Sequence, residues 1–139
     1  MSGIARVSLS LESSLLEKLD RMAKENDYRN RSEFIRDLIR EQLTRQQWKN
    51  NEEVIGTLTL VYNHHQRGLT EKLVELQHHC REKILAATHV HLTHELCAEM
   101  IMIRGSSHGI AALAKAVKQL RGVLHANLAI STTGEKIIF

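Results

Sequence analysis

Hydrophobic and polar residues alternate at the start of the chain with the period of a β-strand. Within residues 4–11, the polar residues Arg6, Ser8 and Ser10 alternate with the apolar residues Val7, Leu9 and Leu11. Because successive strand side chains point to opposite faces, the polar set shares one face. A single short strand is not stable alone, and no second strand follows nearby, so this segment is expected to pair with its own copy.

Two stretches with helical spacing follow this segment. Hydrophobic residues recur every three or four positions over residues 12–25, and again from Phe34 to about Trp48. Asn30 precedes the second stretch and Glu33 lies three residues later, which is the spacing of an N-terminal capping box. The predicted order is therefore strand, helix, helix.

Six more elements are predicted beyond a polar linker at residues 49–53. Apolar runs, punctuated by glycines, indicate strands and helices in the order βαββαβ over 54–62, about 69–82, 84–92, 96–104, about 106–121 and 123–131. This order is typical of the ferredoxin-like arrangement. Its sheet carries both helices on one face, so the other face needs cover from another chain.

Composition narrows the class of protein. The 139 residues are 42% hydrophobic and 25% charged, which is ordinary for a globular chain. No run approaches the ~18 consecutive apolar residues of a membrane span. The start of the chain lacks the apolar core of a signal peptide, so we expect a cytoplasmic protein without a membrane partner. The net charge of +3 is small, so any nucleic-acid binding would depend on a few well-placed side chains.

Histidine is the sharpest compositional signal, because none of the nine occurs before residue 64. His89 and His91 lie two apart in a predicted strand, so both imidazoles project from the same face. Cys97 follows a tight connection that would bring its thiol near them. In a reducing compartment this cysteine is expected to be a free thiol or a metal ligand. Two imidazoles and one thiolate suit a borderline-soft cation.

A fourth ligand is expected from the helix predicted over residues 69–82. His78 lies opposite the apolar stripe of that helix, so it could reach a site on another subunit. Cys80 belongs to the stripe and is expected to be a buried thiol. Gln77 and Glu99 are placed to orient a ligand ring through a hydrogen bond. The remaining histidines without a convincing spacing partner are expected on surfaces or in turns: His64, His65, His94, His108 and His125.

The N-terminal elements favour DNA binding. A two-stranded ribbon from two chains fits the major groove, where an arginine can pair with guanine. The start of the second helix would offer its backbone N–H groups to a phosphate. The candidate DNA contacts are Arg6, Ser8, Ser10, Asn30, Arg31 and Ser32.

Two segments carry a resemblance to the ribbon-helix-helix repressors. They are Arg-Val-Ser-Leu-Ser-Leu at 6–11 and Asn-Arg-Ser-Glu-Phe-Ile-Arg-Asp at 30–37. Together with Gln-His-His-Cys at 77–80, His-Val-His at 89–91 and Cys97, they make the chain from residue 4 to about 131 resemble the nickel-responsive transcriptional regulators.

This resemblance implies an α+β protein with two domains. Residues 1–50 would form a ribbon-helix-helix DNA-binding domain, and residues 51–139 a ferredoxin-like, ACT-type regulatory domain. It also implies a homotetramer built as a dimer of dimers, double-stranded operator DNA as the partner, and one nickel ion per subunit. The ligands it implies are His89, His91 and Cys97 of one chain with His78 of a neighbour.

A second cation site is also implied by the resemblance. Glu33 and Asp37 lie one turn apart on the same helical face, where the family holds a hard cation such as potassium. Without the resemblance, such a pair is most often a solvated salt-bridge surface. Nickel itself rests on the resemblance, because four nitrogen and sulfur ligands suit zinc or copper as well.

The leading hypothesis is a nickel-dependent repressor that controls nickel uptake. The alternative is a ribbon-helix-helix regulator whose C-terminal domain senses another metal or a small molecule such as an amino acid. An enzyme is disfavoured, because four protein ligands close the metal site and no nucleophile or phosphate-binding motif occurs. Metal-dependent DNA binding without turnover would separate the first hypothesis from the others.

Overall fold

The structure is a computed structural model that describes residues 3–137 and divides into two compact units. Of the described residues, the first unit holds 3–43 together with 135–137, and the second holds Thr44–Gly134. In the described part of the chain, no helix combines the length and the apolar character needed to cross a membrane.

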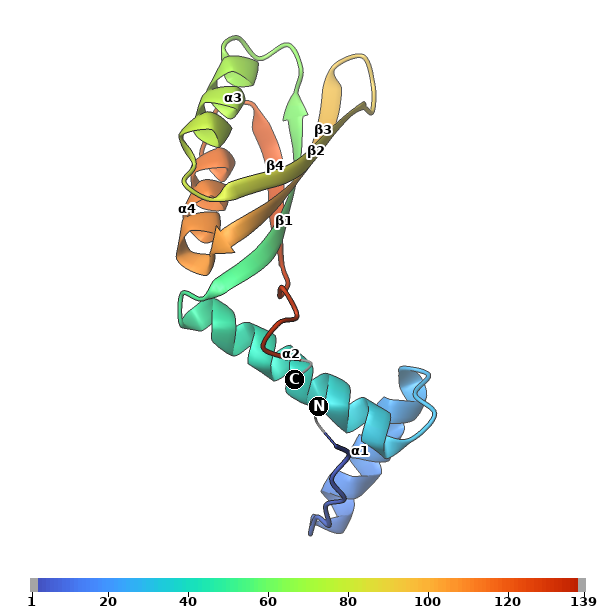
Figure 1. Cartoon of the computed structure of the whole chain (residues 1–139). Coiled ribbons are helices and arrows are strands. Elements are labelled where there is room, and N and C mark those ends of the chain that lie inside the picture. Colours follow the sequence, from blue (N-terminus) through green and yellow to red (C-terminus); the bar gives the residue numbers. More distant parts are fainter. Residues whose placement is uncertain (1–2, 138–139) are drawn as a thin grey trace. The chain divides into compact units, whose positions relative to one another are not determined.

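The N-terminal unit is built on two helices, α1 (Ser13–Glu25) and α2 (Arg31–Lys49), and α2 continues into the second unit (Figure 1). The predicted N-cap of α2 is confirmed, because Asn30 Oδ1 accepts the backbone N–H of Glu33 at 2.9 Å. This bond satisfies one of the N–H groups that a helix start leaves unpaired. Both predicted helices are present, close to their expected bounds.

Residues 3–12 form no helix or strand within the single chain. Ile4, Val7 and Leu9 are 95%, 78% and 64% exposed and line a shallow groove with Ile35 and Ile39 of α2. An extended segment needs a neighbouring strand for its backbone hydrogen bonds, and one chain does not offer it. Pairing with a second copy therefore stays a prediction.

The second unit contains a four-stranded antiparallel sheet with two helices on one face (Figure 1). The strand order is β2-β3-β1-β4. The elements are β1 (Glu53–Asn63), α3 (Leu69–His79), β2 (Lys83–His91), β3 (Leu96–Ser106), α4 (Ser107–Lys118) and β4 (Val123–Ile130). The predicted βαββαβ order and the α+β, ferredoxin-like fold are confirmed.

The core of this unit lies between the helices and the inner face of the sheet. Alternate residues of β1 are buried, among them Leu58 and Leu60, which are fully enclosed. Ile101 of β3 and Ile110 of α4 join them in one cluster. Each fully buried side chain of this size contributes about 1.5–3 kcal/mol, so the inner face holds the sheet and helices together.

The opposite face of the sheet is uncovered in a single chain. Val90 of β2 and Met100 and Met102 of β3 are 47%, 45% and 37% exposed. In the strand register, Val90 lies beside Ala98 and Met100 lies beside Thr59 of β1, so apolar and small polar side chains share this face. Such a face is suited to packing against a second sheet.

Helix α3 is shorter than predicted. It ends at His79, and Cys80 adopts an extended conformation with φ −67° and ψ 129°. The reason lies in Glu82, whose carboxylate accepts hydrogen bonds from Ser106 at 2.8 Å and from Cys80 at 3.3 Å. The Glu82 side chain also covers Gly109 at the start of α4, where a carboxylate is favourable. Because the helix ends at His79, the extended chain after it brings Glu82 into contact with Ser106 and Gly109.

We predict that Glu82→Gln makes the metal-free protein less sensitive to acid. Burial raises the pKa of Glu82, but the hydrogen bonds from Ser106 and Cys80 outweigh it and leave the pKa below the usual 4.5. A depressed pKa stabilises the fold above the ordinary value and loses that contribution as the pH falls through the folded value. Urea unfolding between about pH 7 and pH 3 should therefore show a steeper loss of stability in the wild type. Glu75→Gln, on exposed α3 surface, is the control, and parallel profiles for wild type and Glu82→Gln would contradict the prediction.

Candidate metal centre and DNA-contact residues

The hairpin of β2 and β3 brings a histidine and a cysteine together. In the strand register His91 is paired with Cys97 and His89 with Glu99, so these four side chains share the inner face. The turn between the strands is held by Thr93, whose Oγ1 accepts the N–H groups of Glu95 and Leu96 in the same turn. Sequence spacing predicted that the thiol would lie near the two rings. The strand register places it directly beside His91.

Cys97 is completely buried, whereas the histidines around it are exposed. Its Sγ lies 3.1 Å from Nδ1 of His91, and the ring of His89 lies 5.1 Å from the ring of His91 between centroids. The thiol therefore sits at the bottom of a site whose entrance is lined by imidazoles.

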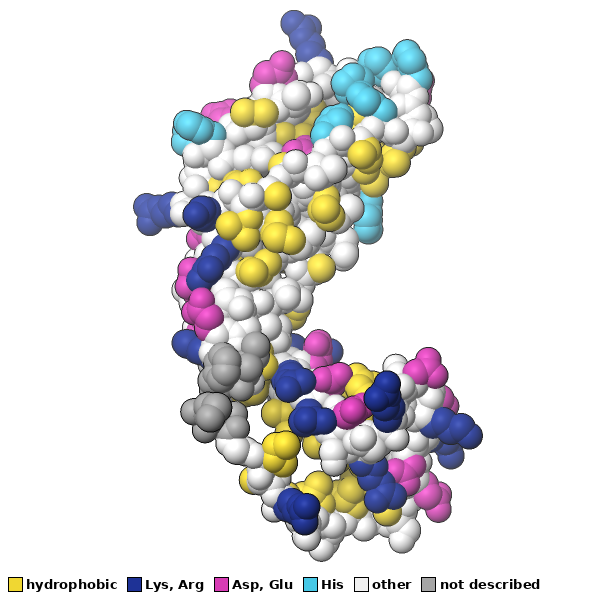
Figure 2. Space-filling model, turned by 45° about the vertical axis from the view of Figure 1, so that its right-hand side comes forward, with side chains coloured by type: hydrophobic (Ala, Val, Ile, Leu, Met, Phe, Trp, Pro, Cys, Tyr) yellow, Lys and Arg dark blue, Asp and Glu magenta, His cyan; other side chains and the backbone are white. Residues whose placement is uncertain are grey.

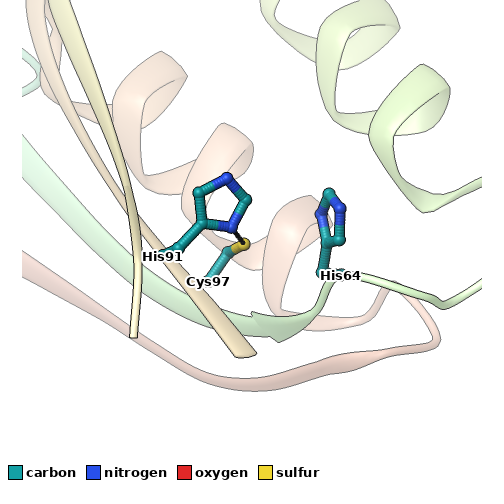
Figure 3. A group of neighbouring side chains, drawn as sticks. All are labelled: His64, His91 and Cys97. Carbon is teal, nitrogen blue, oxygen red and sulfur yellow. Dashed lines mark hydrogen bonds between the residues drawn. The ribbon is translucent and has the colours of Figure 1, made fainter. Parts of the chain in front are cut away.

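His64 joins this group, which the sequence analysis did not anticipate (Figure 3). Its ring lies 5.2 Å from that of His91, and its backbone N–H donates to the carbonyl oxygen of Glu95 at 2.7 Å. The signal that could have found it is the antiparallel pairing of β1 with β3, which sets Asn63 opposite Leu96. His64 is then the first residue beyond the paired strand and must lie beside the β2–β3 turn.

These three residues fit a single metal ion. The ligand atoms of His64, His91 and Cys97 all lie within 4.8 Å of one another. At bonds of about 2.0–2.3 Å, two donors of one ion are at most about 4.6 Å apart, so the exposed rings would have to turn slightly toward the thiol to bind it together. The donor set of imidazoles with one thiolate suits borderline divalent cations of the d-block. The predicted ligand His89 lies beside His91, with 5.1 Å between the ring centroids, but it is not one of the three residues whose ligand atoms lie within 4.8 Å of one another.

Tyr62 holds His89 in a fixed orientation. Its hydroxyl oxygen lies 2.9 Å from Nδ1 of His89. Burial, with the negative charges of Glu99 and Cys97, raises the pKa of Tyr62 to about 12, so the phenol keeps its proton. When His89 donates its Nδ1–H to the Tyr62 oxygen, Nε2 keeps a lone pair for a metal. Tyr62 would thus orient His89 for metal binding, and the sequence analysis did not identify this contact.

We predict that Tyr62→Phe lowers nickel affinity by about 10- to 100-fold, because His89 loses the hydrogen bond that fixes its ring. Competition with a chelator of known affinity measures the change, and circular dichroism verifies the fold. Tyr28→Phe, which alters the other tyrosine, is the matched control and should bind nickel like the wild type. Unchanged affinity in Tyr62→Phe would show that the ring of His89 needs no such support.

The predicted ring-orienting residues are in contact with each other. Gln77 of α3 donates its amide N–H to the carboxylate of Glu99 at 3.4 Å. This bond links the end of α3 to the strand that carries Cys97. His78 follows Gln77 with an exposed side chain, while the neighbouring His79 is bonded through Nδ1 to the carbonyl oxygen of Glu75.

The candidate DNA contacts lie on exposed surface of the N-terminal unit. Arg6, Ser8 and Ser10 are exposed along the segment before α1, and Ser32 is exposed on α2. Arg31 instead makes a two-pronged ion pair with Asp20 of α1, at 2.6 and 2.9 Å. The Arg31 guanidinium holds the pKa of Asp20 below its usual value. A phosphate that binds Arg31 would have to compete with this carboxylate.

The predicted hard-cation residues Glu33 and Asp37 both lie on α2. The carboxylate of Asp37 accepts hydrogen bonds from the hydroxyl of Tyr28 at 2.6 Å and from Arg40 at 3.3 Å. The hydrogen bond from Tyr28 to Asp37 also raises the pKa of Tyr28. A cation at Asp37 would share the carboxylate with these two donors.

Two family models match the chain. Residues 5–46 match the model described as ribbon-helix-helix protein, copG family, and residues 55–131 match the model described as NikR C terminal nickel binding domain. Full-length relatives carry the name nickel-responsive regulator. The one from Syntrophus aciditrophicus is 42% identical over 97% of this chain and 98% of its own length. Those from Solibacter usitatus and Pyrococcus abyssi are 43% and 40% identical, each over at least 97% of this chain and 99% of its own length.

Solved structures resemble the second unit in fold alone. The ACT domain from GTP pyrophosphokinase of Chlorobium tepidum matches with a TM-score of 0.50 at 12% identity, over 55% of this chain and 99% of that one. An uncharacterized protein from Thermotoga maritima matches with a TM-score of 0.51 at 21% identity, over 57% of this chain and 98% of that one. The second unit therefore shares the fold of an ACT domain.

Proposed function

Because the chain belongs to the family of nickel-responsive transcriptional regulators, we propose that it is a nickel-dependent repressor that binds operator DNA when nickel is bound. In this role it would work in the cytoplasm and control nickel uptake. The observation that carries the proposal is the convergence of His91 and buried Cys97 within the part of the chain that matches the nickel-binding model. The family is one of regulators, so we propose no catalytic role.

The proposed nickel ligands are His89, His91 and Cys97 of one chain with His78 of a neighbour, one ion per subunit. The shared inner face of the β2–β3 hairpin supports the first three. The exposed position of His78 at the end of α3 supports a ligand that is offered to another chain. An ion held across a subunit contact would tie nickel binding to the arrangement of the chains.

We assign DNA binding to residues 1–50 and regulation to residues 51–139. The unpaired segment of residues 3–12 and its apolar groove support a dimer in which two copies form an antiparallel ribbon. Arg6, Ser8 and Ser10 would then face the major groove, and the N-terminus of α2 would face a phosphate.

We propose a homotetramer, built as a dimer of dimers through the regulatory units. The exposed apolar residues on the open face of the sheet, Val90, Met100 and Met102, support burial against a second copy. A hard cation such as potassium at Glu33 and Asp37 would be an additional ligand, held in competition with Tyr28 and Arg40.

A DNA-shift assay with promoter fragments tests the proposal. We expect a sequence-specific shift with stoichiometric nickel and little or none after chelation. Addition of amino acids in place of nickel addresses the alternative, in which the second unit senses a small molecule. A shift that is indifferent to nickel and responds to an amino acid would refute a nickel-dependent repressor.

We predict that Arg6→Ala weakens operator binding by about 1–3 kcal/mol and relaxes sequence preference, because it removes a contact to base edges. Arg31→Ala, by contrast, should weaken all DNA sequences alike and lower the salt dependence, because it removes a phosphate contact. Binding curves on operator and scrambled DNA at several salt concentrations measure both effects. Intact operator preference in Arg6→Ala would rule out the ribbon assignment.

A further inference from the structure

The polar linker predicted over residues 49–53 is instead a fixed joint between α2 and β1. Only residues 50–52 separate the two elements. Asn51 adopts a left-handed conformation with φ 54°, and the backbone N–H of Glu52 donates to the carbonyl oxygen of Gln47 at 3.0 Å. This is the Schellman arrangement that closes the end of a helix. The chain therefore passes from α2 into β1 through a hydrogen-bonded turn.

The start of α4 holds the end of α2. The hydroxyl of Ser107, a residue that is only 1% exposed, donates to the carbonyl oxygen of Trp48 at 2.6 Å. The side chain of Asn51 in turn accepts the backbone N–H of His108 at 3.0 Å. Helix ends leave such carbonyl and N–H groups without partners inside the helix. Each element therefore supplies a side chain that pairs an open backbone group of the other.

The segment after β4 also holds the end of α2. The hydroxyl of Thr132 donates to the side-chain oxygen of Gln47 at 2.8 Å, and Gln47 is 6% exposed. The indole N–H of Trp48 donates to the carbonyl oxygen of Ser131 at 2.7 Å. A buried amide oxygen without its partner is unfavourable, so the bond to Thr132 favours one position of this segment against the helix.

This joint lies at the opposite end of β1 from the candidate metal group. His64 follows the last residue of β1, and histidine side chains gather at that end of the second unit (Figure 2). The joint precedes the first residue of the strand, whose 11 residues span about 36 Å at ~3.3 Å each. An effect of the metal on α2 must therefore pass through the second unit and through the contacts that hold α2 to it.

We propose that Ser107 and Thr132 are positioning residues for the nickel response, because they fix the last turn of α2 to the regulatory unit. Residues 31–43 of α2 belong to the first unit and residues 44–49 to the second. A firmly held end allows the arrangement of the regulatory units to act on the DNA-binding part of the same helix. This role rests on the proposed function, whereas the joint itself rests on the contacts described above.

Trp48 is the only tryptophan of the chain, so its fluorescence reports the joint in the metal-free protein. Thr132→Val removes the hydroxyl and keeps the shape of the side chain, and we expect several-fold faster quenching of Trp48 by acrylamide. Thr132→Ser restores the hydroxyl and should behave like the wild type. Thr70→Val makes the same change on exposed α3 surface and should have no effect. Wild-type quenching in both Thr132→Val and Ser107→Ala would overturn the joint.

Nickel titrations of the full chain test the positioning role. Without DNA, Thr132→Val and Ser107→Ala should bind nickel with wild-type affinity and show the wild-type thiolate-to-nickel absorption. The gain in operator affinity that nickel produces should nevertheless shrink by about 2- to 30-fold, the range in which a residue between two sites modulates their coupling. Thr132→Ser should restore this gain, and circular dichroism verifies the fold of each variant.

Two outcomes would overturn the positioning role. One is an undiminished gain in operator affinity in both Thr132→Val and Ser107→Ala. The other is a loss of nickel affinity that accounts for the whole loss of operator binding, because it would place the defect in the metal group. A wild type that does not respond to nickel would refute the proposed function and the positioning role with it, while the quenching result still decides the joint.

Discussion

Cys97→Ala is expected to abolish both the thiolate-to-nickel absorption and nickel-dependent operator binding. Cys97 is the sole sulfur in the group with His64 and His91, and it lies at its buried end. Without the thiolate, the site has only imidazoles, which do not hold a borderline cation as firmly. Nickel titration followed by ultraviolet absorption, together with a DNA-shift assay, measures the two losses.

The matched control is Cys80→Ala, because Cys80 is the only other cysteine of the chain. Cys80 contacts Glu82, and burial raises its pKa, so it is held as a neutral thiol away from the metal group. This variant should keep the absorption and the DNA response. Circular dichroism should show both variants folded, and a normal nickel response in Cys97→Ala would eliminate this residue as a ligand.

His78→Ala is expected to lose most of the nickel response while each chain keeps its other three ligands. A ligand from a neighbouring chain can bind only when the chains are correctly arranged, so its bond favours the DNA-competent state. Loss of that bond removes the difference in nickel affinity between the two arrangements. DNA-shift titrations across nickel concentrations would measure the loss.

Mixing variants distinguishes a ligand supplied by a neighbour from one supplied within a chain. Tetramers that combine His78→Ala with His89→Ala chains should contain some complete sites, so part of the nickel response should return. His79→Ala is the control, because His79 is already bonded to the carbonyl oxygen of Glu75 and should be dispensable. Full nickel response in His78→Ala protein by itself would refute the cross-subunit site.

Element order was predictable because it depends on local patterns. The alternation over β1 and the helical spacing over α4 follow directly from which side chains the core buries, and the N-cap at Asn30 follows from a motif of four residues. The end of α3 was not predictable, because it depends on a contact between Glu82 and Ser106 of another element.

The candidate metal group shows the same division between local and distant effects. His91 and Cys97 are joined by a short hairpin, so their approach follows from spacing and strand period. His64 and Tyr62 come from β1 and the loop after it, and they reach the group only through pairing between strands distant in sequence. Residues brought in by long-range pairing leave no periodic signal in a single sequence.

The packing of Glu82 against Gly109 restricts which sequences this fold can accept. A methyl group at position 109 would collide with the Glu82 carboxylate, so Gly109→Ala would displace this carboxylate from the start of α4. A short residue at position 82 would remove that collision, although the start of α4 would lose its carboxylate. The two positions should therefore covary among related proteins: glycine at 109 is expected where position 82 carries the carboxylate, and a larger residue at 109 where position 82 carries a smaller one.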